Sequence, residues 1–513
     1  MNKQFESLDK EIKVLDPVKD FTVADMTFKN EKMKKVSENI KKQRLRLYWA
    51  FNKSFVGMFP YLVNNPVKPF KGQKVKNDSA ASLFNEVKLM VLTAVKMKFV
   101  DSAIAALPTG SQTSVSIKRN SAMRFEESGQ QDHTGEFTIF GQIYRYLDKQ
   151  TSGKFDCFFK NNVDDMAYSA SFKGEGSIDV GGPYRETLTN LVRDMESGCL
   201  PLFIKSPNNR TDHGDNRECF VVDSSSKTPT HAELFKFAGI LIGYAFRSKS
   251  CMPYNFPPSF WKSLINEKLT EADLNDFDTY AFQAIADMRK LAKTKTDEEF
   301  TQGVDQTFTT LLNNKQEVDL LPGGSNMMVT RKNLEQYIRL MTQKRLQEGE
   351  QQIEWIRQGM YKVCPKNILN MLEWEEIEIR ASGDKVVDVE KLKKITEYYG
   401  DSECKTVKLF WEMMENFDED QKQKYLKFTW GRQRLPADCS DLRYKHTICI
   451  LDSGDDRMPE GHTCFFQIDV PKYSTLEIMT KRFITAIEFC GEIDTDYGAD
   501  QVQNESDDEG SDY

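Results

Sequence analysis

The stretch EGHTCFFQIDVPKY, from Glu460 to Tyr473, places a histidine two residues before a cysteine, in a chain that has only five histidines. Two phenylalanines follow the cysteine, and then a polar run that contains a proline. A buried structural cysteine would suit a strand of this composition. A nucleophilic cysteine would need polar or cationic neighbours, because a free thiol with a pKa of about 8.5 is mostly protonated at neutral pH. The role of Cys464 therefore decides how the chain is interpreted.

His462 and Thr463 are the polar groups that the local sequence offers to Cys464. Residues two positions apart in an extended segment share a face, so His462 is expected on the same side as the cysteine. A cysteine-protease arrangement would also need an asparagine or aspartate to orient the histidine, and the sequence indicates no obvious partner. On spacing alone, a buried strand cysteine is favoured and a catalytic cysteine stays open.

Composition narrows the class of protein to which this chain of 513 residues belongs. At about 150 residues per domain, its length predicts two to four domains. A hydrophobic fraction of 39% and a charged fraction of 29% are typical of a globular protein. The formal net charge of −8 and the pI of about 5.5 argue against a nucleic-acid partner, because phosphates favour basic surfaces. No apolar window reaches 18 residues, so no membrane span is predicted.

The sequence predicts neither a metal site nor a bound cofactor. Its ten cysteines form no CxxC pair and no cysteine–histidine cluster at zinc spacing. The glycine-dense loop GEGSIDVGG, residues 174–182, lacks the lysine–serine pair of a phosphate-binding loop and is predicted to be a tight turn. The segment MNKQFESLDKEIKVLD at the start lacks the apolar region of a secretory signal. Free thiols in a reducing compartment, the cytoplasm or the nucleus, are therefore expected.

Apolar residues that recur every three to four positions predict helices over residues 31–61, 82–107 and 230–250, and a helix–loop–helix over residues 406–430. In the third of these, small residues such as Gly239 and Gly243 permit close contact with another helix. Pro183 opens a further helix directly after the glycine-dense loop, because its fixed φ suits the first turn. The last residues, 501–513, are acidic and nearly free of apolar side chains, so they are predicted to be disordered.

Beyond these patterns, the segment HTCFFQIDVPKYSTLEIMTKRFITAIEFC, residues 462–490, resembles the C-terminal lobe of HECT-type ubiquitin ligases. The signature of that lobe is His-Thr-Cys-Phe-Asn, followed by a leucine-proline-x-tyrosine run and a closing helix. Here Phe466 stands where the family has asparagine. This departure changes the hydrogen bonding of the loop and leaves the nucleophile in place.

Further motifs that resemble the same family occur upstream, in the family's order. They are GEGSIDVGGPYRE, FKFAGILIGYAFRSKSCMPYNFPPSFWKSL, VDLLPGGSNMMVTRKNLEQYIRLM, WEEIEIRASGDKVVDVEKLKKITEYYG, LFWEMMENF and FTWGRQRLP. Together the motifs cover residues 115–496, most of the chain. GGPYRE, RLRLYWAFNKSFVGMFPYL and FCGEIDTDYG are similar to the large HECT ligases that carry RCC1-like repeats, although this sequence contains no such repeats.

The resemblance implies an α+β fold: a bilobal HECT domain with a mainly helical N-lobe, a smaller α/β C-lobe and a helical N-terminal extension. The implied boundaries are 1–110 for the extension, 111–390 for the N-lobe with its conjugating-enzyme-binding subdomain at 262–360, 391–500 for the C-lobe, and 501–513 for the disordered tail. The extension either recognises substrates or braces the N-lobe, and the brace is favoured. Two lobes that approach each other need a hinge, and the candidate is KLKKITEYYG, which ends at Gly400.

The resemblance also implies the chemistry. Cys464 would accept ubiquitin as a thioester from a ubiquitin-conjugating enzyme and pass it to a lysine of a substrate. His462 and Thr463 would orient the loop and stabilise the developing oxyanion, while Phe465 and Phe466 would pack under the loop as anchors. The implied partners are therefore ubiquitin, a conjugating enzyme and a protein substrate.

Two other interpretations stay open. A catalytically weak HECT-fold scaffold is the first, because Phe466 and the C-terminal residues depart from the family pattern. Whether Tyr497 or the acidic tail replaces the usual C-terminal phenylalanine is part of that question. A cysteine hydrolase is the second, and it would need an internal partner for His462 that the sequence does not place.

Other residues carry structural expectations. Cys490 lies on an apolar helix face and is predicted to belong to the core. Glu175, Arg185 and Glu186, which flank the glycine-dense loop, are predicted to form a structural ion-pair set. His446 alternates with apolar residues in YKHTICI and is predicted to lie on the surface of a strand.

Overall fold

The computed structural model describes residues 37, 39–40, 43, 47, 50–52, 88–162, 165–174, 182–436, 439, 442, 444–463 and 465–489. Several predictions fall wholly or mostly outside these residues. They concern the helix at 31–61, the tail at 501–513, and the residues Glu175, Cys464, Cys490 and Tyr497. In the described part of the chain, no helix is both long and apolar enough to cross a membrane.

Contacts divide the chain into two compact units. One contains the described residues up to Pro108 together with Cys364–Ile377, and the other contains Thr109–Val363 together with the described residues from Glu378 onward. The domain boundaries implied by the family resemblance stay predictions. The segment Cys364–Ile377, which the resemblance assigned to the N-lobe, shares its unit with the beginning of the chain.

The smaller unit is held by buried ion pairs. Its described helices are η2 (Lys88–Met90), α7 (Thr93–Ala105) and α18 (Lys366–Leu369), with α19 (Trp374–Ser382) following in the chain. The side chain of Lys96, 2% exposed, lies 2.6 Å from the carboxylate of Glu376, and Lys88 lies 2.9 Å from Glu373. A helix was predicted over 82–107, and α7 confirms its second half.

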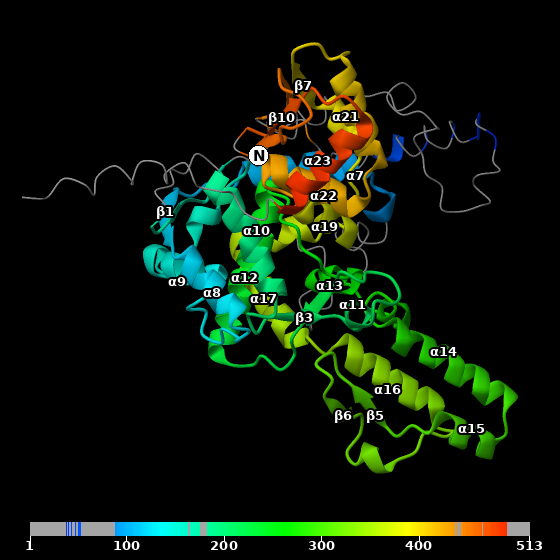
Figure 1. Cartoon of the computed structure of the whole chain (residues 1–513). Helices are drawn as coiled ribbons and strands as arrows, with labels where there is room; N and C mark the ends of the chain where they lie inside the picture. Colours follow the sequence, from blue (N-terminus) through cyan, green and yellow to red (C-terminus); the bar gives the residue numbers. More distant parts are fainter. Residues whose placement is uncertain are drawn as a thin grey trace, which may run out of the picture. The chain divides into compact units, whose positions relative to one another are not determined.

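The larger unit begins with helices and short strands (Figure 1). In Thr109–Val363 the helices are α8 (Arg119–Glu127), α9 (Ile139–Thr151), η3 (Asp156–Phe158), α10 (Gly182–Glu196), α11 (Pro207–Thr211), α12 (Pro229–Ser248), α13 (Pro258–Leu264), η4 (Glu271–Leu274), α14 (Thr279–Thr294), α15 (Asp297–Val304), η5 (Gly324–Asn326), α16 (Leu334–Leu346) and α17 (Glu350–Val363). The strands are β1 (Thr113–Ile117), β2 (Tyr168–Phe172), β3 (Phe203–Lys205), β4 (Phe220–Val222), β5 (Thr309–Leu311) and β6 (Glu317–Asp319). β1 and β2 pair in parallel, whereas β3–β4 and β5–β6 are antiparallel.

Helices α12 and α17 lie against each other at the centre of this part (Figure 1). Gly239 of α12 approaches α17 so closely that an added Cβ would lie 1.9 Å from the carbonyl oxygen of Ile356. Gly359 of α17 meets α12 in the same way, with its ideal Cβ position 1.8 Å from the carbonyl oxygen of Lys236. The predicted close helix contact is confirmed. The cap of α12 is Thr228, two residues before the predicted start.

The second part of the larger unit surrounds one sheet. Its helices are α20 (Val389–Lys394), α21 (Lys405–Asn416), α22 (Glu419–Trp430) and α23 (Leu476–Phe489), and its strands are β7 (Thr396–Tyr399), β8 (His446–Leu451), β9 (Glu460–His462) and β10 (Gln467–Pro471). The strand order is β7-β8-β10-β9, with β9 antiparallel to β10 and the other pairs parallel. A core that runs from Val387 to Ile487 in sequence binds these elements together.

This architecture confirms the predicted α+β class, with helices in excess and small sheets. The predicted helix–loop–helix over 406–430 is α21 followed by α22. The hinge candidate that ends at Gly400 contains β7, a strand of the four-stranded sheet, and Gly400 itself has a φ of 121° that favours glycine. Its role as a hinge stays a prediction.

Candidate active site

The residues that flank Cys464 lie at the end of a β-hairpin. β9 ends at His462 and β10 begins at Gln467, and these two residues are paired across the hairpin. The amide of Phe465 donates to the carbonyl oxygen of His462 at 3.0 Å, and the amide of Thr447 on β8 donates to the carbonyl oxygen of Phe466 at 2.9 Å. The signature segment is thus attached to the sheet on both sides of Cys464, which itself lies outside the described residues.

The two phenylalanines after Cys464 have different surroundings. Phe466 is fully buried and stacks on Trp430 with ring centroids 4.4 Å apart, so the prediction of an anchor under the loop is confirmed for this residue. The prediction is wrong for Phe465, whose side chain is 53% exposed and touches Tyr444 edge-on. An exposed aromatic ring beside the signature cysteine is available for contact with another molecule.

The backbone at Phe466 explains how the departure from the family signature is accommodated. Phe466 has a φ of 53°, in the left-handed region that asparagine adopts much more readily than phenylalanine. Here burial of the ring between Trp430 and His446 offsets the backbone cost. The turn therefore keeps a conformation suited to asparagine while it carries an apolar anchor.

His462 has an acidic partner that the sequence analysis missed. Its Nε2 lies 3.0 Å from Oδ2 of Asp469, and the other carboxylate oxygen of Asp469 accepts from Gln467 Nε2 at 2.8 Å. Asp469 is on β10, two residues beyond the position paired with His462. The hairpin register brings the two side chains to one face, and a predicted hairpin around the cysteine could have found the pair.

His462 and Asp469 also belong to the one group of described residues whose side chains could approach a metal ion. Glu460 is its third member, and the ligand atoms of the three lie within 4.8 Å of one another. Arg457 pairs with Glu460 at 2.8 Å, and His462 already shares a hydrogen bond with Asp469. These partners satisfy the three groups without a metal, so the arrangement supports orientation of His462 instead.

Helix α10 holds the carbonyl group next to Cys464. Nη1 of Arg185 donates to the carbonyl oxygen of Thr463 at 2.8 Å, and Oγ1 of Thr189 donates to the carbonyl oxygen of Gly431 at 3.2 Å. Positions 185 and 189 are one turn apart on the same face of the helix. Gly431 lies close to both Arg185 and Thr463, because its ideal Cβ position is 3.5 Å from the first and 3.9 Å from the second. The signature segment thus rests on α10 through backbone carbonyls.

The predicted ion-pair set around the glycine-dense loop is tested only in part, because Glu175 lies outside the described residues. Glu186 pairs with Arg119 at 2.8 Å, which confirms an ion pair for that residue. Arg185, 7% exposed, contributes the hydrogen bond to Thr463 described above. Sequence analysis could not have found that contact, since 278 residues separate its two partners.

His446 lies beneath the hairpin and is fully buried, so the prediction of a strand-surface residue is wrong. Its Nδ1 lies 2.8 Å from Oγ1 of Thr396 and its Nε2 lies 2.6 Å from the hydroxyl of Tyr425. Because the Thr396 hydroxyl donates to the Leu392 carbonyl, it accepts from Nδ1–H, and Nε2 then accepts from Tyr425. Burial lowers the pKa of His446 to about 3, so the imidazole stays neutral.

Four of the described cysteines are poor candidates for a nucleophile, because their thiol pKa values are raised. Burial raises the pKa of Cys157 and of Cys251 to about 12, and burial together with the nearby Asp469 raises that of Cys449 to about 11. Burial also raises the pKa of Cys219. Thiols of this kind contain almost no thiolate at neutral pH and are inert.

Comparison with known proteins identifies the class to which this arrangement belongs. The family model described as HECT-domain (ubiquitin-transferase) matches residues 189–495, which include the hairpin and Cys464. The chain belongs to this family. It is 31% identical over 367 residues, 71% of its length, to the E3 ubiquitin-protein ligase HERC2 of Mus musculus. The predicted family is therefore confirmed.

Other relatives carry the same class of name. The chain is 26% identical over 343 residues to the E3 ubiquitin-protein ligase TOM1 of Saccharomyces cerevisiae and 29% identical over 328 residues to RSP5 of Chaetomium thermophilum. These regions make up 64% and 62% of this chain. The chain spans only 7% of the mouse HERC2, 10% of TOM1 and 38% of RSP5. Its HERC2 and TOM1 relatives are thus very large ligases, as the motifs predicted.

Proposed function

We propose that this chain is a HECT-type ubiquitin-protein ligase in which Cys464 carries ubiquitin as a thioester. The observation that carries the proposal is the family match over residues 189–495, within which His462, Thr463, Cys464 and Phe465 reproduce the signature of the family. The raised pKa values of Cys157, Cys219, Cys251 and Cys449 support the choice of Cys464, because they leave those thiols protonated.

The proposed reaction has two steps. In the first, the Cys464 thiolate attacks the carbonyl carbon of the thioester on a ubiquitin-conjugating enzyme, a new thioester forms, and the cysteine of that enzyme leaves as thiolate. In the second, a neutral substrate lysine amine attacks the Cys464 thioester, an isopeptide bond forms, the ammonium proton passes to solvent or a base, and Cys464 leaves as thiolate. The first exchange is nearly isoenergetic, so positioning should supply much of the rate enhancement.

His462 and Thr463 support the site in this proposal. Asp469 orients His462, and Arg185 holds the Thr463 carbonyl, so hydrogen bonds position the two residues that precede the cysteine. The segment at 262–360 receives the conjugating enzyme, and the protein substrate completes the set of partners. The free thiols among the described cysteines support a reducing location, the cytoplasm or the nucleus.

The test combines the chain with activating enzyme, a panel of conjugating enzymes and ubiquitin, followed by gels with and without a thiol reductant. A thiol-sensitive ubiquitin adduct is expected for the wild type and should be absent for Cys464→Ala. Cys199→Ala is a matched control, because Cys199 is a half-buried thiol elsewhere in the same unit, and it should form the adduct normally. If the wild type forms no adduct with any conjugating enzyme, the chain is better described as a HECT-fold scaffold. Release of free ubiquitin to water would instead favour a hydrolase.

A further inference from the structure

The segment from Glu271 to Leu346 has a hydrophobic core of its own. Leu274, Phe277, Ile285, Phe300, Phe308, Val329, Leu334, Tyr337, Ile338 and Met341 are buried together there, and Val221 is the buried member of that cluster that comes from outside the segment. α14, α15, α16 and the β5–β6 hairpin form this segment (Figure 1). We call Glu271–Leu346 the arm and the rest of Thr109–Val363 the body. The arm makes up most of the region proposed to receive the conjugating enzyme.

One edge of the junction between arm and body is densely hydrogen-bonded. Asn208 of α11 is fully buried, and its Nδ2 donates to the carbonyl oxygen of Asn275 at 3.2 Å. Its Oδ1 accepts from the amide of Thr279 at 2.8 Å, and its own amide donates to the carbonyl oxygen of Phe277 at 3.0 Å. Three bonds from one buried residue fix this edge, because breaking them would leave polar groups unsatisfied.

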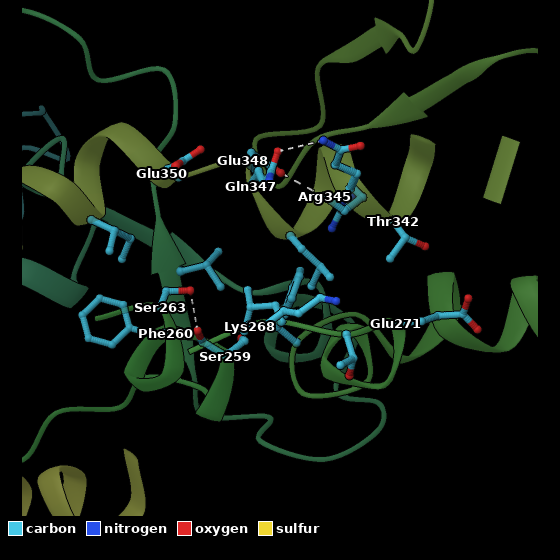
Figure 2. A pocket seen from close by; sticks show the side chains of 18 of the residues that line it. Ser259, Phe260, Ser263, Lys268, Glu271, Thr342, Arg345, Gln347, Glu348 and Glu350 are labelled. Atoms are coloured by element: carbon cyan, nitrogen blue, oxygen red, sulfur yellow. Dashed lines mark hydrogen bonds and ion pairs between the residues drawn. The ribbon is translucent and has the colours of Figure 1, made fainter. Parts of the chain in front are cut away.

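The other edge of the junction contains a cavity of about 670 Å³. Figure 2 shows Thr342, Arg345 and Glu348 on one side of it and Ser259, Phe260 and Ser263 on the other. Close packing normally makes an interface rigid, and a space of this size means that arm and body are not packed against each other over the whole of this edge. The position of the arm at this edge therefore depends on a few polar contacts together with Val221, which lines the cavity and packs into the core of the arm.

Glu348 supplies one of the polar links across this edge. It lies in the short connection between α16 and α17, with its side chain 3% exposed. Its Oε1 accepts from the Ser224 hydroxyl at 3.0 Å and from the amide of Asn313 at 2.8 Å, and its Oε2 accepts from the same amide at 3.0 Å. Ser224 follows β4 in the body, whereas Asn313 follows β5 in the arm. One carboxylate thus joins arm to body.

Arg345 keeps the arm side of this link in place. Its Nη2 donates to Oδ2 of Asp278 at 2.8 Å and to Oδ1 of Asn313 at 2.7 Å, and its Nη1 donates to the Leu311 carbonyl. Nε of Arg345 lies 3.9 Å from Glu348. Asn313 is therefore held by Arg345 of the arm and by Glu348 of the body, and Ser224 fixes the Glu348 carboxylate within the body. The Asn313 carbonyl oxygen also accepts from Nη1 of Arg210 on α11 at 2.8 Å, which is a second polar link to the body.

We propose that Glu348 is a positioning residue that sets the tilt of the arm, with the Asn208 edge as pivot and the cavity as the side on which the arm can move. The inference rests on the proposed function, because the arm is the part proposed to carry the conjugating enzyme. The tilt determines where the thioester of that enzyme arrives relative to Cys464. Glu348 acts on the first transfer step and leaves the second step unchanged.

Glu348→Ala should slow the transfer of ubiquitin from the conjugating enzyme to Cys464 about tenfold or more, because a displacement of about 1 Å can cost that much in rate. The affinity for the conjugating enzyme should stay within about twofold, since α16 and the arm core are intact. Discharge of a preformed Cys464 thioester to free lysine should also be unchanged. Ser224→Ala should show the same pattern more weakly, and Glu348→Gln should be intermediate because it retains one acceptor oxygen.

Glu350→Ala is the matched control, because Glu350 is exposed and lines the same cavity two residues further on. Unchanged first-step kinetics in Glu348→Ala would overturn the proposal, and so would a loss of affinity for the conjugating enzyme, which would indicate an unfolded arm.

Amide hydrogen exchange provides a readout that does not need activity. Exchange at Asn313 should rise in Glu348→Ala while that of α16 stays slow, and an unchanged rate at Asn313 would refute the link. If wild-type protein forms no thioester, the proposed function fails, and the exchange result still decides the link.

Discussion

The helix pair α12–α17 and the hairpin end between β9 and β10 differ in what fixes their position. At the helix pair, Gly239 and Gly359 bring backbone against backbone, so that even one added carbon atom would overlap the facing helix. At the hairpin, the carbonyl of Thr463 is held by one hydrogen bond from Arg185, with Thr189 bonded to Gly431 beside it. The first contact depends on shape over a whole surface. The second depends on a few groups that can release and reform.

The hairpin end can move more easily than the α12–α17 helix pair. A packed helix pair resists small displacements, because each one costs many contacts at once. A segment held by two or three hydrogen bonds can leave its position for a much smaller free energy. A thioester carrier that must serve two partners in turn needs the second kind of attachment near its nucleophile. The arm and its Glu348 link follow the same logic at a different junction.

The largest effect on stability is expected from a substitution at Gly239, where α12 meets α17. Gly239→Ala should destabilise the larger unit by about 3 kcal/mol or more, because overpacking against rigid backbone has no flexible side chain to absorb it. The measurement is thermal melting, in which this variant should unfold well below the wild type.

Gly303→Ala is the matched control for Gly239→Ala. Gly303 lies in α15, is exposed, and has nothing within 4 Å of its ideal Cβ position. The same substitution there should stabilise the helix by about 0.5–1 kcal/mol. Equal melting temperatures for the two variants would mean that the close approach of α12 and α17 is not a feature of the folded protein.

A smaller effect is expected at His446, beneath the hairpin. Burial lowers its pKa from 6.5 to about 3, so the folded state keeps the imidazole neutral while the unfolded chain takes up a proton below pH 6.5. Stability from this group is therefore present above pH 6.5 and is lost as the pH falls towards 3. Between pH 6.5 and pH 5 the loss should be about 2 kcal/mol, from 1.36 kcal/mol for each pH unit.

His446→Gln tests this pH dependence, because glutamine can hydrogen-bond to Thr396 and Tyr425 without titrating. Denaturant unfolding followed at Trp411 and Trp430, which both belong to the core around the sheet, should be steeply pH-dependent in the wild type over this range. In the variant, the free energy of unfolding should change less steeply with pH, because unfolding takes up one proton fewer. An identical slope in both proteins would rule out a neutral buried His446 as the cause.

Features that depend on neighbouring residues in the sequence were predicted with success. The small residues of α12 indicated a close helix contact, and the periodicity over 406–430 indicated two helices. Each of these signals is local, because helix periodicity acts over a few residues.

The contacts that build the site could not be predicted in this way. Arg185 and Thr463 are 278 residues apart, and Ser224 and Glu348 are 124 apart, so only the tertiary structure brings them together. His446 was placed on a surface because alternation cannot distinguish an exposed face from one covered by α21 and α22. Phe466 illustrates a different limit, since its left-handed φ is visible only in the backbone, although the asparagine of the family signature suits such a conformation.

The smallest of these effects is expected at the hairpin attachment itself. Arg185→Ala removes the hydrogen bond to the Thr463 carbonyl and should change the rate of ubiquitin transfer through Cys464 about tenfold, equivalent to about 1.4 kcal/mol. Thr189→Ala removes a longer, uncharged hydrogen bond and should change the rate only about twofold. Single-turnover formation and discharge of the Cys464 thioester, measured separately, would show which step needs the docked hairpin.

Arg193→Ala controls for the loss of a charge from the same helix. Its guanidinium is 39% exposed and lies 3.4 Å from Glu126 of α8, two turns along α10 from Arg185. Transfer rates in this variant should stay close to those of the wild type. If Arg185→Ala and Arg193→Ala behave alike, the bond to Thr463 has no part in the reaction. If Arg185→Ala alters one step and spares the other, the hairpin is docked on α10 in only one of them, which is the behaviour that a few releasable hydrogen bonds allow and a packed helix pair does not.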